Sequence, residues 1–126
     1  MKMLLYVALG GAAGAAGRYL VAMQTIRMFG PQLPVGTFVV NVLGSLALGL
    51  LVELLALRLT VTPEVRAFLV IGLLGGFTTF SAFSLDVSLM IERNEWLEAL
   101  TYALASVVLS VGALFLGLWL GRAYFP

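Results

Sequence analysis

Four long apolar stretches divide the chain, and they constrain its fold more than any other feature. They cover about residues 3–28, 35–57, 64–91 and 96–121. A helix needs about 20 mostly apolar residues to cross the hydrocarbon core of a bilayer, so each stretch is long enough. Of the 126 residues, 62% are hydrophobic and 10% are charged, against about 45–50% and 25% in average soluble domains. The sequence predicts an all-α membrane protein, a single domain over residues 1–126 with four transmembrane helices.

Turn-forming residues separate the stretches. The segment Gly30–Pro34 contains a glycine and two prolines, which cannot continue a helix. Thr62, Pro63 and Glu64 form a helix-start pattern, because proline suits a first helical position and an acidic residue suits the helix dipole. The polar run at residues 92–95 ends the third stretch. We therefore expect four separate helices with short connections.

The first stretch has a competing interpretation. It follows Lys2 and ends in small residues, as a cleaved signal peptide does. However, apolar sequence continues beyond Arg18, and the other three stretches remain in either case. We expect the first stretch to be a transmembrane helix.

Positive charge is nearly balanced across the predicted bundle. With four spans both termini share one side, which holds Lys2, Arg58, Arg66 and Arg122, whereas the opposite side holds Arg27 and Arg93, and Arg18 lies within its helix. Because the orientation of a membrane protein follows its lysine and arginine bias, so small a bias predicts insertion in both orientations. An ordinary topology with cytoplasmic termini is also compatible with it.

Composition excludes several classes of function. The chain has no cysteine and no histidine, which removes thiolate chemistry, imidazole catalysis and the usual zinc ligands. The net charge is +1 and the basic residues are scattered, so nucleic-acid binding is not expected. We do not expect an enzyme.

Small residues are spaced for close helix contacts. Pairs of glycines four residues apart form the pattern used for packing in membranes: Gly10 with Gly14, Gly72 with Gly76, and Gly117 with Gly121. Such pairs serve contacts within one bundle or between subunits, and the spacing leaves both open. Because four helices cannot easily enclose a pathway of their own, a homodimer is the natural unit.

An unusual run lies in the middle of the third stretch. Gly75 and Gly76 are followed by Thr78 and Thr79, and this combination weakens a helix and exposes backbone carbonyls, which a membrane tolerates where something binds them. We predict a break in the third helix, with a packing kink as the alternative. Phe80 and Phe83 share one face just beyond it, and polar residues, Ser81, Ser84, Asp86 and Ser88, lie nearby.

Intramembrane polar residues also occur in the other stretches. Tyr102, Ser106 and Ser110 follow one another at intervals of four and form a hydroxyl stripe on one helix face, which favours a hydrated or anion-conducting groove over hydroxyls bonded to their own backbone. Asn41 in the second helix either joins helices or binds a solute. Arg18 supplies positive potential to a groove or reaches the interface. Glu53 can reach the interface or pair with a basic residue.

Three segments resemble the Fluc, or CrcB, family of microbial fluoride channels: GGAAGAAGRY from Gly10, GTFVVNVLGS from Gly36 and GLLGGFTTFSAFS from Gly72. The resemblance covers nearly the whole chain, and the third segment is the most specific. Ala82 stands where a hydroxyl residue is expected between the two phenylalanines, and Asp86 stands where Glu is expected.

The resemblance implies a fluoride-selective passive channel of the cell inner (plasma) membrane, which exports fluoride from the cytoplasm and so protects against its toxicity. It implies an antiparallel, dual-topology homodimer with two fluoride pathways. It also implies that the backbone carbonyls of Gly75 and Thr78 from both subunits hold a structural sodium ion, Na⁺. The fluoride pathway implied for each subunit comprises Arg18, Asn41, Thr79, Phe80, Ser81, Phe83, Tyr102, Ser106 and Ser110.

Two other functions compete with this one. A small dual-topology multidrug exporter needs a carboxylate in its first helix for proton exchange, and this chain has Arg18 there instead. An assembly subunit held by its glycine faces would leave Asn41, the phenylalanine pair and the hydroxyl stripe without a role.

Overall fold

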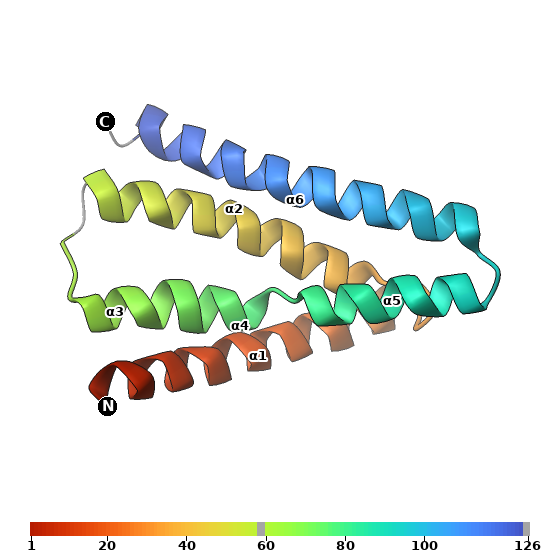
Figure 1. Ribbon diagram of the computed structural model, residues 1–126, viewed down its shortest axis with the longest axis horizontal. Coiled ribbons are helices and arrows are strands. Elements are labelled where there is room, and N and C mark those ends of the chain that lie inside the picture. The colour runs from red at the N-terminus through yellow and green to blue at the C-terminus, as the bar shows by residue number, and fades with distance from the viewer. Residues whose placement is uncertain (58–59, 125–126) are drawn as a thin grey trace.

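The computed structural model describes residues 1–57 and 60–124, and within them four helices are long and apolar enough to cross a membrane. This confirms the prediction of four spans (Figure 1). The first, second and fourth are continuous: α1 (Lys2–Phe29), α2 (Val35–Leu57) and α6 (Trp96–Tyr124). The third consists of four consecutive segments, α3 (Pro63–Ala67), η1 (Phe68–Leu74), α4 (Gly75–Phe77) and α5 (Phe80–Glu92).

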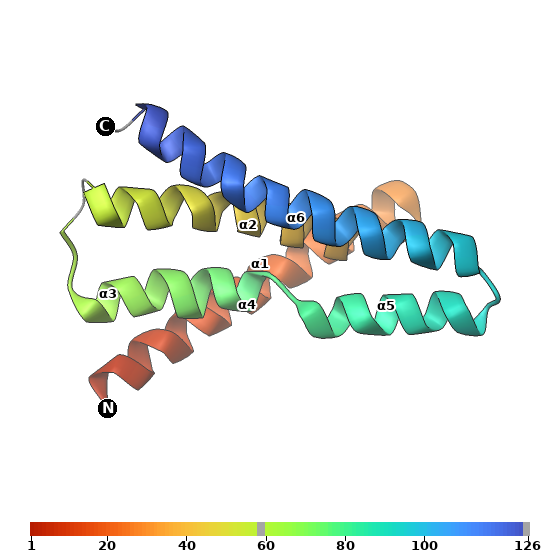
Figure 2. The ribbon, with the colours of Figure 1, turned by 45° about the horizontal axis from the view of Figure 1, so that its top comes forward.

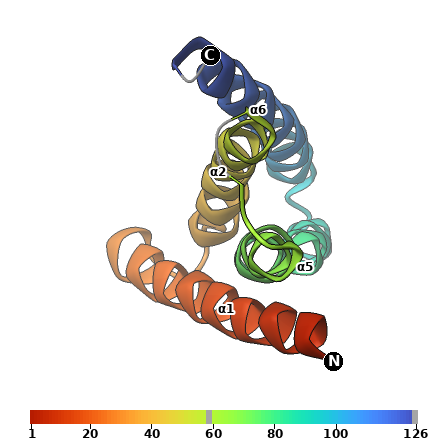
Figure 3. The ribbon, with the colours of Figure 1, turned by 90° about the vertical axis from the view of Figure 1, so that its left-hand side faces the viewer.

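The helices run up and down and leave α1 and α6 on opposite outer sides. Viewed from one end, α2 lies between α6 and the third helix, and α1 crosses the outer face of the third helix (Figure 3). The N-terminus and the end of α6 lie at the same end of the bundle (Figure 1), as an even number of spans requires. Arg58, part of the charge prediction above, lies outside the described residues.

The helix ends follow local chemistry. Thr62 caps α3, because its hydroxyl oxygen accepts a hydrogen bond from the Val65 amide at 3.2 Å. Gly30 ends α1 at φ 85°, a backbone angle that favours glycine. Asn94 has φ 62° in the short turn between α5 and α6, a conformation that asparagine tolerates better than most residues. The predicted helix start at Thr62 is confirmed.

The glycine pairs pack helices against one another within the single chain. A Cβ atom added to Gly14 would lie 2.2 Å from the Leu73 carbonyl oxygen, and one added to Gly76 would lie 2.8 Å from the Gly11 carbonyl oxygen. Between α2 and α6, a Cβ atom added to Gly117 would lie 2.4 Å from the Leu46 carbonyl oxygen. Contact within the bundle is therefore the role that the structure gives these glycines.

An ion pair joins α2 to α6 near their ends. Arg122 Nε donates to Glu53 Oε1 at 2.7 Å, and Glu53 is 9% exposed. A Cβ atom added to Gly121 would lie 2.6 Å from Glu53 Cβ, so glycine makes room for the carboxylate stem. Glu53 thus pairs with a basic residue, which is one of the two expected outcomes.

The third helix is broken, but at the threonines rather than at the glycines. Gly75 has helical angles (φ −62°, ψ −38°), whereas Thr78 and Thr79 are extended, and the offset between α4 and α5 is visible in Figure 2. Thr78 Oγ1 donates to the Leu74 carbonyl at 3.0 Å, and Thr79 Oγ1 accepts from the Ala82 amide at 3.1 Å. The two hydroxyls therefore cap the helix ends on either side of the break.

Candidate functional site

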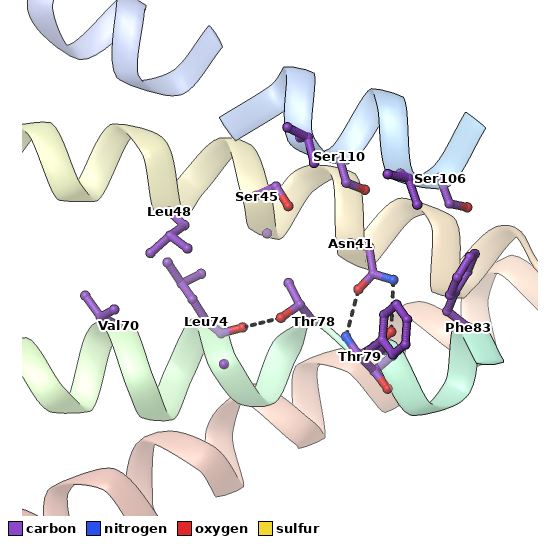
Figure 4. Close-up of a pocket in the computed structure, with 15 residues that line it drawn as sticks. Asn41, Ser45, Leu48, Val70, Leu74, Thr78, Thr79, Phe83, Ser106 and Ser110 are labelled. Atoms are coloured by element: carbon purple, nitrogen blue, oxygen red, sulfur yellow. Dashed lines mark hydrogen bonds between the residues drawn. The ribbon is translucent and has the colours of Figure 1, made fainter. Parts of the chain in front are cut away.

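A cavity of about 400 Å³ lies beside the break, between α2, the third helix and α6. Its lining combines apolar side chains with a smaller polar group (Figure 4). The polar residues come from all three helices: Asn41, Ser45, Thr78, Thr79, Ser106 and Ser110. Buried apolar surroundings with a few placed polar groups are typical of a small-ligand site.

Asn41, on α2, binds the extended backbone of Thr79 at the break in the third helix. Its Nδ2 donates to the Thr79 carbonyl at 3.0 Å, and its Oδ1 accepts from the Thr79 amide at 2.7 Å. Both backbone groups of an extended residue in the middle of a membrane span are thereby satisfied. An amide nitrogen carries a second N–H, so Asn41 keeps one donor for a ligand while it fixes Thr79.

The break frees backbone carbonyls by diverting their helical donors. In an unbroken helix the Gly75 carbonyl would accept from the Thr79 amide, but that amide donates to Asn41. The Thr78 carbonyl would accept from the Ala82 amide, but that amide donates to Thr79 Oγ1. The two carbonyls that lose their helical donors are those of Gly75 and Thr78. These are the residues for which the resemblance implies a cation site.

Ser106 and Ser110 present free hydroxyls on the α6 wall of the cavity. Within the described residues, their Oγ atoms are buried and have no hydrogen-bond partner, and Ser106 is only 5% exposed. An unpartnered buried hydroxyl costs about 1–3 kcal/mol, so the pair is an unusual feature unless a ligand or water binds it. The predicted stripe therefore reaches the cavity through these two serines.

Phe80 and Phe83 lie at the α5 end of the cavity with different environments. Their ring centroids are 5.4 Å apart, but Phe80 is 74% exposed and Phe83 only 9%. Phe83 also contacts the Tyr102 ring, with 5.3 Å between centroids. Phe83 thus belongs to the interior of the bundle, whereas Phe80 projects from the bundle at the edge of the cavity.

Tyr102 and Asp86 form a second polar contact behind Phe83. The Tyr102 hydroxyl donates to Asp86 Oδ2 at 3.0 Å and joins α6 to α5. Asp86 also lines a small cavity of about 60 Å³ next to the turn between α1 and α2. The Tyr102 hydroxyl is therefore engaged with Asp86, while Ser106 and Ser110 face the larger cavity.

Three of the predicted pathway residues lie beside the cavity rather than on its wall, as far as the structure describes the chain: Arg18, Ser81 and Tyr102. The Ser81 and Thr79 hydroxyls lie 3.1 Å apart at the start of α5. Arg18 Nε donates to the Gly76 carbonyl at 3.2 Å, which places the guanidinium group against α4.

Ser45 is a polar wall residue that the sequence reasoning missed. It lies four residues after Asn41 and therefore on the same face of α2, and it lines the cavity with Ser110 (Figure 4). The spacing from Asn41 was the signal that could have identified it.

The chain is similar to known proteins over nearly its whole length. A family profile described as "CrcB-like protein, Camphor Resistance (CrcB)" matches residues 5–118. A "Fluoride-specific ion channel FluC" of Caulobacter sp. (strain K31) is 52% identical over 99% of this chain and 98% of the relative. A protein of the same description from Chelativorans sp. (strain BNC1) is 54% identical over 98% of both chains. These matches extend over the three helices that form the cavity.

Proposed function

The chain belongs to the CrcB-like family, and from that premise we propose that it is a fluoride-selective passive channel of the inner membrane, not an enzyme. The full-length similarity to fluoride-specific channels supports the substrate. The main structural support for the site is the pair of buried, unpartnered hydroxyls of Ser106 and Ser110 on the cavity wall.

Fluoride is small and strongly hydrated, so a pore must replace its water with compact hydrogen-bond donors. Ser106 and Ser110 each offer an O–H group on the α6 wall, and the second N–H of Asn41 adds a donor on the α2 wall. No fixed cationic side chain lines this part of the described chain, which suits conduction, since an ion that binds too tightly cannot leave.

Aromatic rings complete the pathway at the α5 end. The ring edge of phenylalanine carries the positive end of the quadrupole, so Phe80 and Phe83 can face an anion with their edges. Tyr102 keeps Phe83 in place through the ring contact and its bond to Asp86. Thr79 and Ser81 place further hydroxyls where α5 begins.

The break fits a monovalent cation. Backbone carbonyl oxygens are hard, neutral ligands of the kind that sodium accepts, and those of Gly75 and Thr78 have lost their helical donors. One subunit offers two such oxygens, so a second copy would be needed to surround an ion. A bound sodium ion would supply fixed positive charge that offsets part of the cost of dehydrating fluoride.

An antiparallel homodimer is the assembly that we favour, because a second copy would cover the exposed face of the third helix around Gly75. Gly75 is exposed in the middle of a membrane span, as are Ile71 one turn before it and Phe80 after it. Lipid cannot hydrogen-bond a free carbonyl, and each unsatisfied group costs several kcal/mol there. A second copy that covers this face would shield the carbonyls and close the open side of the cavity.

Reconstitution tests the function. Purified protein in liposomes loaded with potassium fluoride should release fluoride on addition of valinomycin, measured with a fluoride electrode. The same vesicles loaded with potassium chloride should release chloride no faster than protein-free vesicles. Equal release of both anions would contradict selectivity, and no release of either would contradict a channel.

A further inference from the structure

Arg18 lies on the face of α1 that packs against the third helix. Gly10, Gly14 and Arg18 follow at intervals of four and form one line along α1. Added Cβ atoms on the two glycines would lie 3.1 Å from backbone atoms of Gly72 and Gly76, so α1 approaches the third helix at backbone distance. This close approach brings Arg18 to the level of the break.

The direction of the side chain explains its partner. Helical side chains lean toward the N-terminus of their helix, so Arg18 reaches back toward Gly76, which packs against α1 one turn earlier. Its Nε donates to the Gly76 carbonyl at 3.2 Å. In an unbroken helix that carbonyl would accept from the Phe80 amide, but the chain leaves the helix at Thr78. Arg18 replaces the hydrogen bond that the break removes.

We infer that Arg18 is a positioning residue for the cation site, acting through the Gly76 carbonyl rather than as an entrance charge for fluoride. The bond fixes the carbonyl that follows Gly75 and so keeps the Gly75 and Thr78 carbonyls oriented for the ion. This inference rests on the proposed sodium site, and it differs from the place in the fluoride pathway that the resemblance implies for Arg18.

Charge and hydrogen bonding can be separated at this position. A cationic guanidinium beside a sodium site repels the ion, so the site gains from the Nε donor and not from the charge. Glutamine carries its Nε2 at the same distance along the side chain as Arg Nε. Arg18→Gln therefore keeps the donor without the charge, and Arg18→Met removes both. Arg27→Gln is the matched control, because Arg27 is exposed in the last turn of α1.

The test measures the sodium concentration that gives half of the maximal thermal stabilisation of the purified protein, with N-methylglucamine replacing sodium. We expect Arg18→Gln and Arg27→Gln to keep the parent midpoint within about threefold, and Arg18→Met to raise it about tenfold, the effect of one hydrogen bond. Hydrogen–deuterium exchange of the peptide over residues 75–82 should rise in Arg18→Met and stay at the parent level in Arg18→Gln.

Other outcomes would overturn the inference. If Arg18→Met leaves the midpoint and the exchange unchanged, or if Arg18→Gln shifts both as far as Arg18→Met does, Arg18 does not position the site through its donor. If Arg18→Met does not assemble, the sodium midpoint of Arg18→Gln is used alone. A parent-like midpoint then supports the inference, and a tenfold rise opposes it. A parent without any sodium dependence overturns the sodium site itself, whereas fluoride release by the parent tests the channel separately.

Discussion

Phe80 and Phe83 are three residues apart on α5, yet the subunit uses them differently. Phe83 is buried against Tyr102 and Phe80, whereas Phe80 projects from the subunit with 74% of its surface exposed. An exposed ring contributes little to the folding of its own subunit. Its contribution must therefore be sought in contacts outside the subunit, with an anion or with a second copy.

Replacing each phenylalanine by isoleucine keeps the apolar character and removes the ring edge. We expect Phe80→Ile to lower fluoride release about tenfold, the effect of about 1.4 kcal/mol at the limiting barrier, and to lower the melting temperature less than Phe83→Ile does, because it loses only the ring contact with Phe83. We expect Phe83→Ile to lower both, because it also loses two ring contacts worth about 0.5–1.5 kcal/mol each. Electrode assays and thermal melts of the reconstituted variants measure the two effects.

Phe115→Ile is the control for this pair, since Phe115 is exposed on α6 away from the cavity lining. It should release fluoride at the parent rate. Parent-like release by Phe80→Ile would show that this ring does not act on the anion.

At the scale of elements, the close approach of α1 to the third helix depends on glycine. A Cβ atom at Gly14 would lie 2.2 Å from the Leu73 carbonyl oxygen and 2.8 Å from the Phe77 amide nitrogen, both backbone atoms just before the break. A Cβ atom at Gly11 would meet no atom within 4 Å. The two glycines of one helix thus allow a matched comparison.

Gly14→Ala should push α1 away from α4, whereas Gly11→Ala should be tolerated. Overpacking of this kind costs about 1–3 kcal/mol, so we expect Gly14→Ala to lower the melting temperature clearly and to reduce fluoride release. Alanine is the better helix former, so Gly11→Ala should melt at or above the parent temperature. Equal melting temperatures for the two variants would contradict the packing described for α1.

The sequence predicted some of these elements and not others, for physical reasons. Long apolar runs, the Thr62 cap and the Gly30 turn depend on local chemistry, so they were visible in the sequence. The break was predicted from glycines next to threonines, but its position depends on Asn41, which lies on another helix and pairs with Thr79. The π-helical segment Phe68–Leu74 had no recognised sequence signal.

The candidate site, too, was predictable from the sequence only in part. The intervals of four residues identified Ser106 and Ser110, and they could have identified Ser45. Which hydroxyls stay free depends on tertiary contacts, since the Tyr102 hydroxyl bonds Asp86 while the two serines have no partner within the described residues. The partner of Arg18 likewise depends on how closely α1 approaches Gly76.

At the scale of the whole molecule, an antiparallel dimer requires the same chain to insert in both orientations. The chain has no cysteine, so a cysteine introduced at Met1 is a unique reporter of its terminus. We expect an impermeant thiol reagent to label part of the protein from outside intact cells and the remainder only after permeabilisation, because the basic residues are nearly balanced. Complete labelling from one side would contradict dual topology and leave a parallel arrangement.

In the proposed pathway, fluoride passes the free hydroxyls of Ser106 and Ser110 in the cavity. We would measure the rate of fluoride release from liposomes by the Ser106→Ala/Ser110→Ala double variant. Ser88→Ala is the control, since the Ser88 hydroxyl donates to the Leu85 carbonyl of the same helix. Removing unpartnered buried hydroxyls should not lower stability, so we expect an unchanged or higher melting temperature together with release at least about tenfold slower. Release by the double variant at the parent rate would contradict it.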